Sequence, residues 1–362
     1  MKQTSSKKPK VLLLPEPRRL RRRNLFLPAL VTGGLCLALL LPFTSFAPFV
    51  KNTLTGSSAV NEINTGSSTK PFPIGVNPKT KTVSESPQVT TYIDTSVASN
   101  HTGPSLATGW LTKLTAKLAQ LDWYQNLASP ISRTLVIQSG ERSEEVVAHF
   151  AHILGWDTAE QDIFRTRLQS EVPELPDGKL YPGKYTVAKN ADPESVAVAV
   201  AEKFNAEVRT RYTDEIESVV PLRDTLIIAS LLEREAYDFE DMRYISGIIW
   251  NRLFINMRLQ IDATMQYARS TQNKPTGAEN WWPVPTPADK SIDSPYNTYK
   301  NSGLPPGPIA NPSIDAIIAA LNPRETDCLF YFHDTVGKFY CTKTYEEHVT
   351  LLKQVYRTEK EK

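Results

Sequence analysis

Two carboxylates stand close together in the stretch IIASLLEREAYDFEDM, which runs from Ile227 to Met242. The stretch begins as an apolar helical pattern and reaches Glu233 and Glu235 before that pattern ends. Counted at about 100° per residue from Leu226, Glu235 falls in the middle of the apolar face and Glu233 falls nearly opposite. The two side chains therefore cannot form one catalytic pair on this helix, and their roles must differ.

A carboxyl group on a buried helical face is desolvated, and desolvation raises its pKa. Glu235 would then keep its proton near neutral pH, as general acid catalysis at a glycosidic oxygen requires. The residues alone leave a second interpretation equally open, in which Glu235 is a buried carboxylate satisfied by a core arginine or tyrosine. Glu233 is expected to have a structural role, solvated or beside the charged neighbourhood of Arg234.

Polar side chains follow this helix in two further segments. In RLQIDATMQYA, residues 258–268, they alternate with apolar residues, as in an extended segment that lines a cleft: Gln260, Asp262, Thr264 and Gln266. The loop SPYNTYKNSGLPPGPIANPS, residues 294–313, is rich in proline and glycine and costs little entropy to order. It carries amide, hydroxyl and phenol groups that suit sugar recognition: Tyr296, Asn297, Thr298 and Tyr299. A plain surface connection would explain the prolines but not this density of polar groups.

Charge separates the first 50 residues from the rest of the chain. Residues 1–23 hold nine lysines and arginines against one acid, and residues 24–50 hold no charged residue. An apolar span of about 20 residues crosses a bilayer, and a basic flank stays in the cytoplasm and contacts anionic lipid. We therefore expect a cytoplasmic tail, a transmembrane helix over 24–50 and an extracytoplasmic remainder. A cleaved signal peptide is the alternative, which the long apolar run disfavours.

The composition of the whole chain is ordinary for a globular protein. A formal net charge of +2, with 22% charged residues, argues against nucleic-acid binding. Residues 51–130 predict a mobile linker with a short helix near 106–127, and residues 131–212 predict a small unit of strands and helices. In that unit we expect a strand from Thr134, a helix ending at Gly155, a strand pair around Pro182-Gly183 and a helix capped by Asp192. Residues 213–362 predict a long helical stretch over 214–256, a loop-rich region over 270–312, helices at 312–321 and 344–357, and a hairpin between those last two.

Cysteine and histidine usage limits the chemistry further. Cys36 lies in the apolar span, and Cys328 and Cys341 flank the predicted hairpin LFYFHDTVGKFY. Outside the cytoplasm these two could form a disulfide, and two unpaired thiols are an equally open interpretation. The five histidines lack ligand spacing, so neither a metal nor another cofactor is expected.

The segments ASLLEREA, WNRLFINMRLQID and SPYNTYKNSGLPPGPIANPS closely resemble the MltG/YceG-like endolytic murein transglycosylases, single-pass proteins of the bacterial inner membrane. The resemblance is strong over residues 222–352 and weaker from Leu135. It implies that Glu235 is the catalytic acid. It also implies that the β-1,4 bond between N-acetylmuramic acid and N-acetylglucosamine is cleaved without water, which leaves a 1,6-anhydro end.

The same resemblance implies an α+β architecture with a transmembrane helix, a LysM-like subdomain over 131–212 and a catalytic domain over 213–362. It implies three kinds of partner: peptidoglycan glycan strands, cell-wall synthases and, through the N-terminal helix, membrane lipid. Arg252 has an alternative structural role, paired with Glu233 or a core carbonyl. Residues expected to line or brace the groove are Asn251, Arg252, Leu259, Gln260, Asp262, Thr264, Tyr267, Tyr296, Asn297, Thr298 and Tyr299.

The chain also departs from the family pattern. In QIDATMQY, Ile261 and Ala263 stand where the family usually has Thr and Pro, and only one LysM-like unit is evident where members often carry two. Trp281 and Trp282 are expected either to stack on sugar rings or to pack a loop. Two other functions remain open: a hydrolase that uses Asp262 as a second carboxylate, and a non-catalytic scaffold that binds the cell wall.

Overall fold

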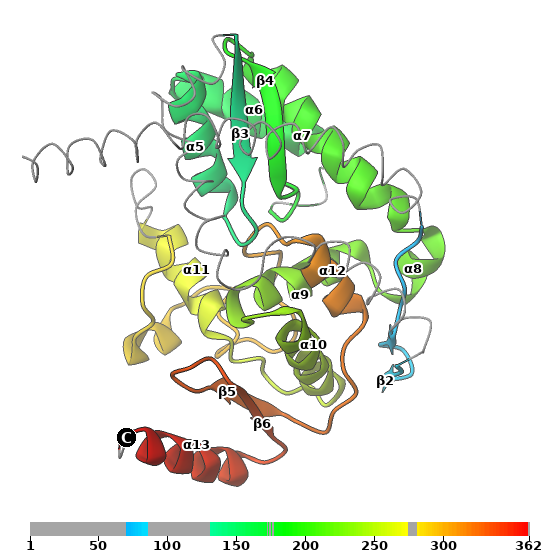
Figure 1. The fold of residues 1–362 in the computed structure, drawn as a ribbon, viewed down its shortest axis with the longest axis vertical. Coiled ribbons are helices and arrows are strands. Elements are labelled where there is room, and N and C mark those ends of the chain that lie inside the picture. The colour runs from blue at the N-terminus through cyan, green and yellow to red at the C-terminus, as the bar shows by residue number, and fades with distance from the viewer. Residues whose placement is uncertain are drawn as a thin grey trace, which may run out of the picture. The chain divides into compact units, whose positions relative to one another are not determined.

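The computed structural model describes residues 70–85, residues 131–273 except 172, 174 and 176, and residues 281–360 (Figure 1). The predicted basic tail, the predicted membrane helix over 24–50 and the short helix expected near 106–127 lie outside the described residues. Within the described part of the chain, no helix is both long and apolar enough to cross a membrane.

Within the predicted unit over residues 131–212, two antiparallel strands lie against three helices (Figure 1). Residues 135–201 contribute a separate hydrophobic core, whereas Phe204, Val208 and Tyr212 belong to the main core. The predicted caps are confirmed: a helix ends at Gly155 with a φ of 75°, and Asp192 accepts a hydrogen bond from the Ser195 backbone N–H at 2.9 Å. The elements are β3 (Ser132–Ile137), α5 (Ser143–Leu154), α6 (Thr158–Glu171), β4 (Gly183–Ala188) and α7 (Pro193–Glu207).

Two expectations for this unit are wrong. The expected strand pair around Pro182-Gly183 is not formed, because β4 pairs with β3 rather than with a strand directly before Pro182. The sequence also missed α6, which buries only Phe164 and Leu168 and therefore has a weak apolar periodicity.

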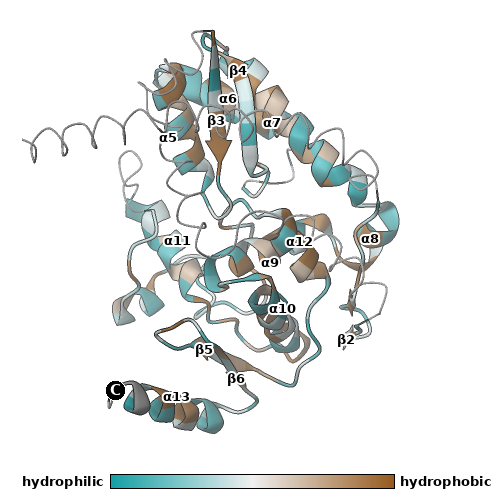
Figure 2. Cartoon of the chain, in the orientation of Figure 1, coloured by the Kyte–Doolittle hydropathy of each residue, from teal (hydrophilic) through white to brown (hydrophobic). Residues whose placement is uncertain are grey.

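The rest of the chain is mainly helical, and Figure 2 colours α12 as mostly apolar where it lies against α9. The predicted helical stretch over 214–256 is confirmed and consists of three helices, separated at Pro221 and by an extended Ala236. Short 3-10 turns lie at Arg209–Arg211 and Pro287–Ser291. The elements are α8 (Asp214–Val219), α9 (Leu222–Glu235), α10 (Phe239–Phe254), α11 (Asp262–Asn273), α12 (Ile314–Leu321), β5 (Phe330–His333), β6 (Phe339–Thr342) and α13 (Tyr345–Lys360).

The segment RLQIDATMQYA is not extended beyond Ile261, because Asp262 opens α11. The alternation of polar and apolar residues was misleading, because α11 buries polar side chains whose hydrogen bonds are made within the protein. The Thr264 hydroxyl donates to the Ile261 carbonyl at 2.6 Å, and the Ser270 hydroxyl donates to the Trp281 carbonyl at 2.8 Å. Gln260, just before the helix, has a φ of 50° and turns the chain into α11.

Part of the predicted linker belongs to the fold. Residues 70–85 contain the short antiparallel strands β1 (Val76–Asn77) and β2 (Thr82–Val83). Phe72 and Val76 are each only 3% exposed in the main core, and the Gly75 backbone N–H donates to the Leu321 carbonyl at 2.9 Å. The expectation of a mobile linker is therefore wrong for this segment.

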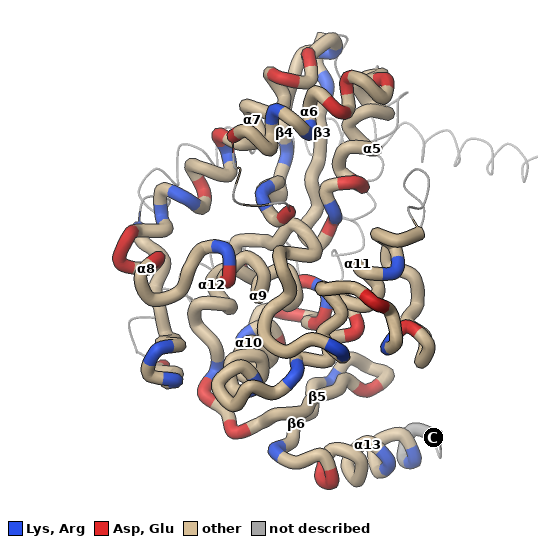
Figure 3. The backbone as a smooth tube through the Cα atoms, turned by 180° about the vertical axis from the view of Figure 1, so that it is seen from behind, with Lys and Arg blue, Asp and Glu red and all other residues tan. Residues whose placement is uncertain are grey.

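The predicted hairpin is confirmed: β5 and β6 pair antiparallel, with Tyr331 opposite Cys341. The structure contains the disulfide between Cys328 and Cys341, whose Cα atoms are 5.8 Å apart. Basic and acidic residues are interspersed along the described elements (Figure 3).

Candidate active site

Glu235 is the last residue of α9, and its side chain is partly buried. The phenol of Tyr331 on β5 donates a hydrogen bond to its Oε2 at 2.8 Å, and the backbone N–H of Ala263 also donates to the carboxylate. Burial raises the pKa of Glu235, and these two donors oppose that rise. Burial thus favours the protonated form of Glu235, while the ionised form has two hydrogen-bond donors available.

The Ala263 donor belongs to the first turn of α11, so the Glu235 carboxylate lies at a helix N-terminus. Unpaired backbone N–H groups and the helix dipole at such an end favour negative charge. A carboxyl in this environment can release its proton and later accept one. That is the requirement for a group that acts first as an acid and then as a base.

A second carboxylate lies close to Glu235. Asp262 is exposed at the start of α11, and its Oδ1 accepts a hydrogen bond from the Tyr299 phenol at 2.6 Å. Its negative charge further raises the pKa of Glu235. Burial, and then the neighbouring Asp262, raise the pKa of Tyr299 and keep that phenol protonated. Asp262 and Tyr299, which are both expected to line the groove, therefore lie beside the candidate acid.

Arg252 and Asn251, both on α10, hold backbone segments next to this site. The Arg252 guanidinium donates through Nε to the Leu329 carbonyl at 2.7 Å, and it also donates to the Leu259 carbonyl. Asn251 donates through Nδ2 to the Thr326 carbonyl at 2.6 Å. Arg252 thus fulfils the core-carbonyl alternative and does not pair with Glu233.

Three of the predicted groove residues are buried braces. The Thr264 and Thr298 hydroxyl oxygens are 2.9 Å apart, and the Thr298 carbonyl accepts from the Gln260 backbone N–H at 3.2 Å. The Asn297 side-chain amide donates to the Ile292 carbonyl at 2.8 Å. Asn297 and Thr298 are at most 2% exposed, so they hold the loop in place, whereas the Gln260 side chain is exposed.

Farther along α11, the ring of Tyr267 lies beside that of Tyr296 from the loop over residues 294–313, with ring centroids 4.6 Å apart. The buried Arg142, which precedes α5, places its guanidinium 4.0 Å above the Tyr267 ring and 4.6 Å from the Trp281 ring. Trp281 therefore packs a loop. Its neighbour Trp282 is partly buried and lies beneath the Arg234 guanidinium at 3.9 Å.

Glu233, for which a structural role is predicted, is partly buried rather than freely solvated. Its Oε1 accepts a hydrogen bond from the Ser313 backbone N–H at 2.7 Å, at the start of α12. Burial is the main cause that raises the pKa of Glu233. The helical-face argument assumed a single covered face, whereas α9 is covered by both α10 and α12.

Two neighbours of Glu235, Tyr331 and His333, were not identified from the sequence. Tyr331 bonds to its carboxylate, and His333 Nε2 lies 2.9 Å from the Asp241 carboxylate at the start of α10. Tyr331 and His333 are two residues apart on β5 and therefore point to the same face of the strand. The two-residue spacing of Tyr331 and His333 could have indicated that they share a face, but only the hairpin was predicted from this segment.

A buried carboxyl, Asp177, leads to a prediction about pH and stability. It accepts hydrogen bonds from the Ser143 hydroxyl and the Gly178 backbone N–H, and burial raises its pKa to about 6. The folded state then binds more protons than the unfolded state between about pH 4 and 6, so this group makes the free energy of unfolding fall as pH rises through that window. The free energy of unfolding of Asp177→Asn, relative to that of wild type, should therefore increase by about 2 kcal/mol from pH 4.5 to pH 7. Denaturant titrations at both pH values measure it, with exposed Asp162→Asn as control; equal pH slopes for Asp177→Asn and wild type would contradict it.

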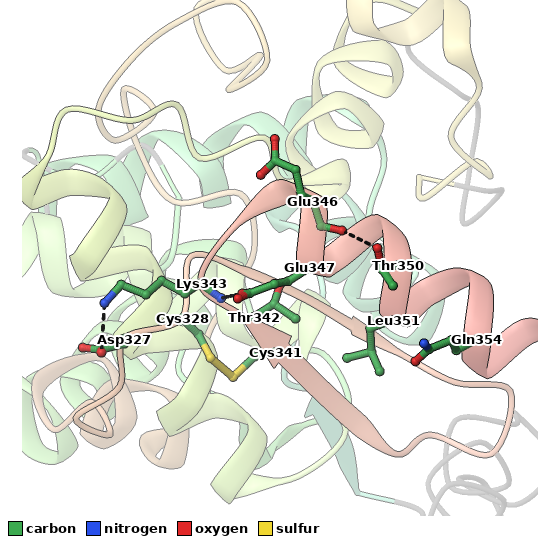
Figure 4. A pocket seen from close by; sticks show the side chains of 10 residues that line it. All are labelled: Asp327, Cys328, Cys341, Thr342, Lys343, Glu346, Glu347, Thr350, Leu351 and Gln354. Atoms are coloured by element: carbon green, nitrogen blue, oxygen red, sulfur yellow. Dashed lines mark hydrogen bonds and ion pairs between the residues drawn. A yellow bond between two sulfur atoms is a disulfide. The ribbon is translucent and has the colours of Figure 1, made fainter.

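No group of His, Cys, Asp and Glu within the described part of the chain could hold a metal ion. A hollow of about 630 Å³ lies between the disulfide and α13 (Figure 4). Glu235 and its hydrogen-bond partners are not among the residues that line it: Asp327, Cys328, Cys341, Thr342, Lys343, Glu346, Glu347, Thr350, Leu351 and Gln354.

The chain is similar to known proteins of one kind. The endolytic murein transglycosylase of Bacillus subtilis strain 168 is 34% identical over 193 residues, which are 53% of this chain and 50% of that protein. That of Streptococcus pneumoniae strain D39 is 33% identical over 174 residues, 48% of this chain and 31% of that protein. The chain thus spans half or less of these relatives.

A crystal structure of a YceG-like protein from Listeria monocytogenes has a TM-score of 0.52 and 30% identity, and it covers 60% of this chain and 75% of that one. The expected mixed α+β fold is thereby confirmed. A model of the YceG-like family matches residues 62–354. This match includes α9, α11 and the hairpin around Glu235, and it establishes that the chain belongs to the YceG-like family.

Proposed function

We propose that this chain is a lytic transglycosylase that cleaves the β-1,4 bond between N-acetylmuramic acid and N-acetylglucosamine in peptidoglycan and leaves 1,6-anhydro ends. The observation that carries the proposal is the Glu235 carboxyl, whose pKa is raised by burial and which has two hydrogen-bond donors for its ionised form. The names of the relatives support it, since each is called an endolytic murein transglycosylase.

One carboxyl is sufficient for this reaction. Protonated Glu235 donates its proton to the glycosidic oxygen as the bond from that oxygen to the muramyl C1 breaks. The resulting carboxylate, held by Tyr331 and the α11 N-terminus, accepts the proton of the muramyl 6-hydroxyl while O6 bonds to C1. Glu235 ends protonated as it began, and no water is added. Hydrolases usually need a second carboxylate to activate water or to attack C1.

The first experiment is digestion of purified peptidoglycan with the full chain, followed by mass analysis of the new ends. The full chain is needed because Phe72 and Val76 lie in the core. Products about 18 Da lighter than their hydrolysed equivalents would support the transglycosylase, since no water is consumed. Reducing ends would indicate a hydrolase. Binding without cleavage would favour the scaffold.

Asp262 distinguishes the transglycosylase from the hydrolase, because it is the carboxylate near Glu235. In the transglycosylase its charge would favour the cationic, oxocarbenium-like transition state, so Asp262→Asn should lower kcat about tenfold and still give anhydro ends. In a hydrolase Asp262 would activate water or attack C1, and its loss would abolish cleavage. Steady-state rates with mass analysis of the products separate the two outcomes.

We further propose that residues 24–50 anchor the protein in the bacterial cytoplasmic membrane, with the N-terminus inside and the catalytic part outside. The Cys328–Cys341 disulfide supports an oxidising compartment for the catalytic part. The unit over 131–212, which contains a separate hydrophobic core, is proposed to act as a LysM-like grip on glycan strands. Cell-wall synthases are the proposed partners, because a cut near the membrane would end nascent strands.

A further inference from the structure

The Tyr331 side chain donates a hydrogen bond directly to the Glu235 carboxylate, at 2.8 Å. Its own pKa lies well above the ordinary value because it is buried and because it faces Glu235. The phenol therefore remains protonated over the whole working range of pH and acts as a donor. A donor of this kind stabilises the ionised form of its acceptor and fixes the orientation of the carboxyl group.

The position of Tyr331 is fixed by the hairpin that carries it. Tyr331 lies directly opposite Cys341 in the antiparallel register, and Cys341 is bonded to Cys328 just before β5. From α10, Asn251 donates to the Cys328 carbonyl at 3.2 Å and Arg252 to the Leu329 carbonyl at 2.7 Å. The strand end that presents the phenol is thus held by a covalent bond and by two buried or half-buried side chains of the WNR segment.

We propose that Tyr331 is a positioning residue for Glu235, and that the Cys328–Cys341 disulfide keeps it there by fixing the hairpin. The role of Tyr331 in catalysis rests on the proposed function, but its hydrogen bond to Glu235 does not. Tyr331 would hold the carboxyl in the orientation from which it donates its proton. It would also stabilise the carboxylate that must take up the proton of the sugar hydroxyl.

Other groups also face Glu235 and must be held constant in any test. Asp262 raises its pKa, whereas the neighbouring His333 lowers it. The charges of Arg234 and Arg252 and the phenol of Tyr299 also interact with it electrostatically. The test therefore removes only the Tyr331 hydroxyl and retains the ring, which lies 6.0 Å from that of Phe339.

The experiment is a titration of the Glu235 carboxyl by ¹³C NMR in the full chain, assigned by loss of the signal in Glu235→Gln. In Tyr331→Phe the pKa of Glu235 should rise by about one unit, because a hydrogen bond to a charged group is lost. The alkaline limb of the pH–rate profile should move upward by the same amount, since the acid stays protonated to a higher pH. We expect kcat to fall about tenfold with KM unchanged, because orientation at the reacting bond is lost.

A matched control is available in the same hairpin. Tyr340 on β6 donates to Asp334 at 3.2 Å, and its ring lies against Phe332. Tyr340→Phe should leave the pKa of Glu235 unchanged. A loss of activity in Tyr331→Phe without a shift in the pKa or the pH profile would show a merely structural role and would overturn the proposal.

The disulfide is tested in the same titration. Replacing Cys328 and Cys341 with serine should raise the pKa of Glu235 in the wild-type background and add no further shift in Tyr331→Phe, because both changes act through one contact. Equal shifts in both backgrounds would overturn the role of the disulfide. Since the carboxyl titration does not need turnover, a shift in a chain that releases no anhydro product would support the positioning role and refute the proposed function alone.

Discussion

Replacing Glu235 with glutamine is expected to reduce cleavage of peptidoglycan by about a thousandfold or more, which is the scale of a lost general acid. Glutamine has nearly the same shape and can still accept hydrogen bonds from Tyr331 and Ala263, but it has no proton to give to the glycosidic oxygen. Burial raises the pKa of Glu235, so the change also removes a costly ionisable group. The melting temperature should therefore be unchanged or slightly higher. Release of anhydro products and thermal unfolding measure the two effects.

Glu233→Gln provides the comparison, because Glu233 is on the same helix and its pKa is also raised by burial. Its Oε1 accepts from the Ser313 backbone N–H, and the amide oxygen of glutamine can replace it there. Cleavage by this variant should stay within about tenfold of wild type. Substantial cleavage by Glu235→Gln, or equal losses in both variants, would contradict the assignment of the acid.

The helical-face argument separated Glu235 from Glu233 but left a catalytic and a structural role for Glu235 equally open, and only the family resemblance implied the catalytic role. The caps at Gly155 and Asp192 and the hairpin around Gly337 were predicted, since each depends on a few neighbouring residues. In these cases, residues that are close together in the sequence determine the local structure.

Contacts between distant segments could not be predicted in this way. Tyr331 lies 96 positions after Glu235, and no periodicity relates the two residues. Glu233 was placed in solvent because nothing local shows that α12 covers its side of α9. The alternation in residues 258–268 was interpreted as an extended segment, because polar residues were assumed to face solvent. The sequence does not show that the buried Thr264 hydroxyl finds a carbonyl partner in the folded chain.

Arg142 is the distant contact with the largest expected effect on stability. Its guanidinium is fully buried between the Tyr267 and Trp281 rings. It donates to the Glu144 carboxylate at 2.7 Å, to the Thr271 hydroxyl at 3.0 Å and to the Tyr267 carbonyl at 3.2 Å. These bonds join the start of α5 to α11, the helix whose N-terminus holds Glu235.

Arg142→Ala should lower the free energy of unfolding by about 4 kcal/mol, because it leaves buried acceptors without their donor and opens a cavity between two rings. The melting temperature should fall by about 10 °C for a folded part of this size. Arg142→Lys should recover only part of the loss, since an ammonium group cannot stack between rings or make the paired bonds to Glu144. The exposed Arg165, paired with Asp162 at 2.9 Å, is the matched control, and Arg165→Ala should change stability by less than about 0.5 kcal/mol.

The same substitution also tests the link between Arg142 and Asp177. The Arg142 charge opposes the rise that burial causes in the pKa of Asp177. Without Arg142 that pKa should rise further, so the loss of stability as pH increases should extend to a higher pH than in wild type. Denaturant titrations of Arg142→Ala from pH 4.5 to 8 measure this. A loss of stability equal at every pH would show that Arg142 acts by packing alone, and a melting temperature within about 2 °C of wild type would show that the joint between α5 and α11 contributes little to the fold.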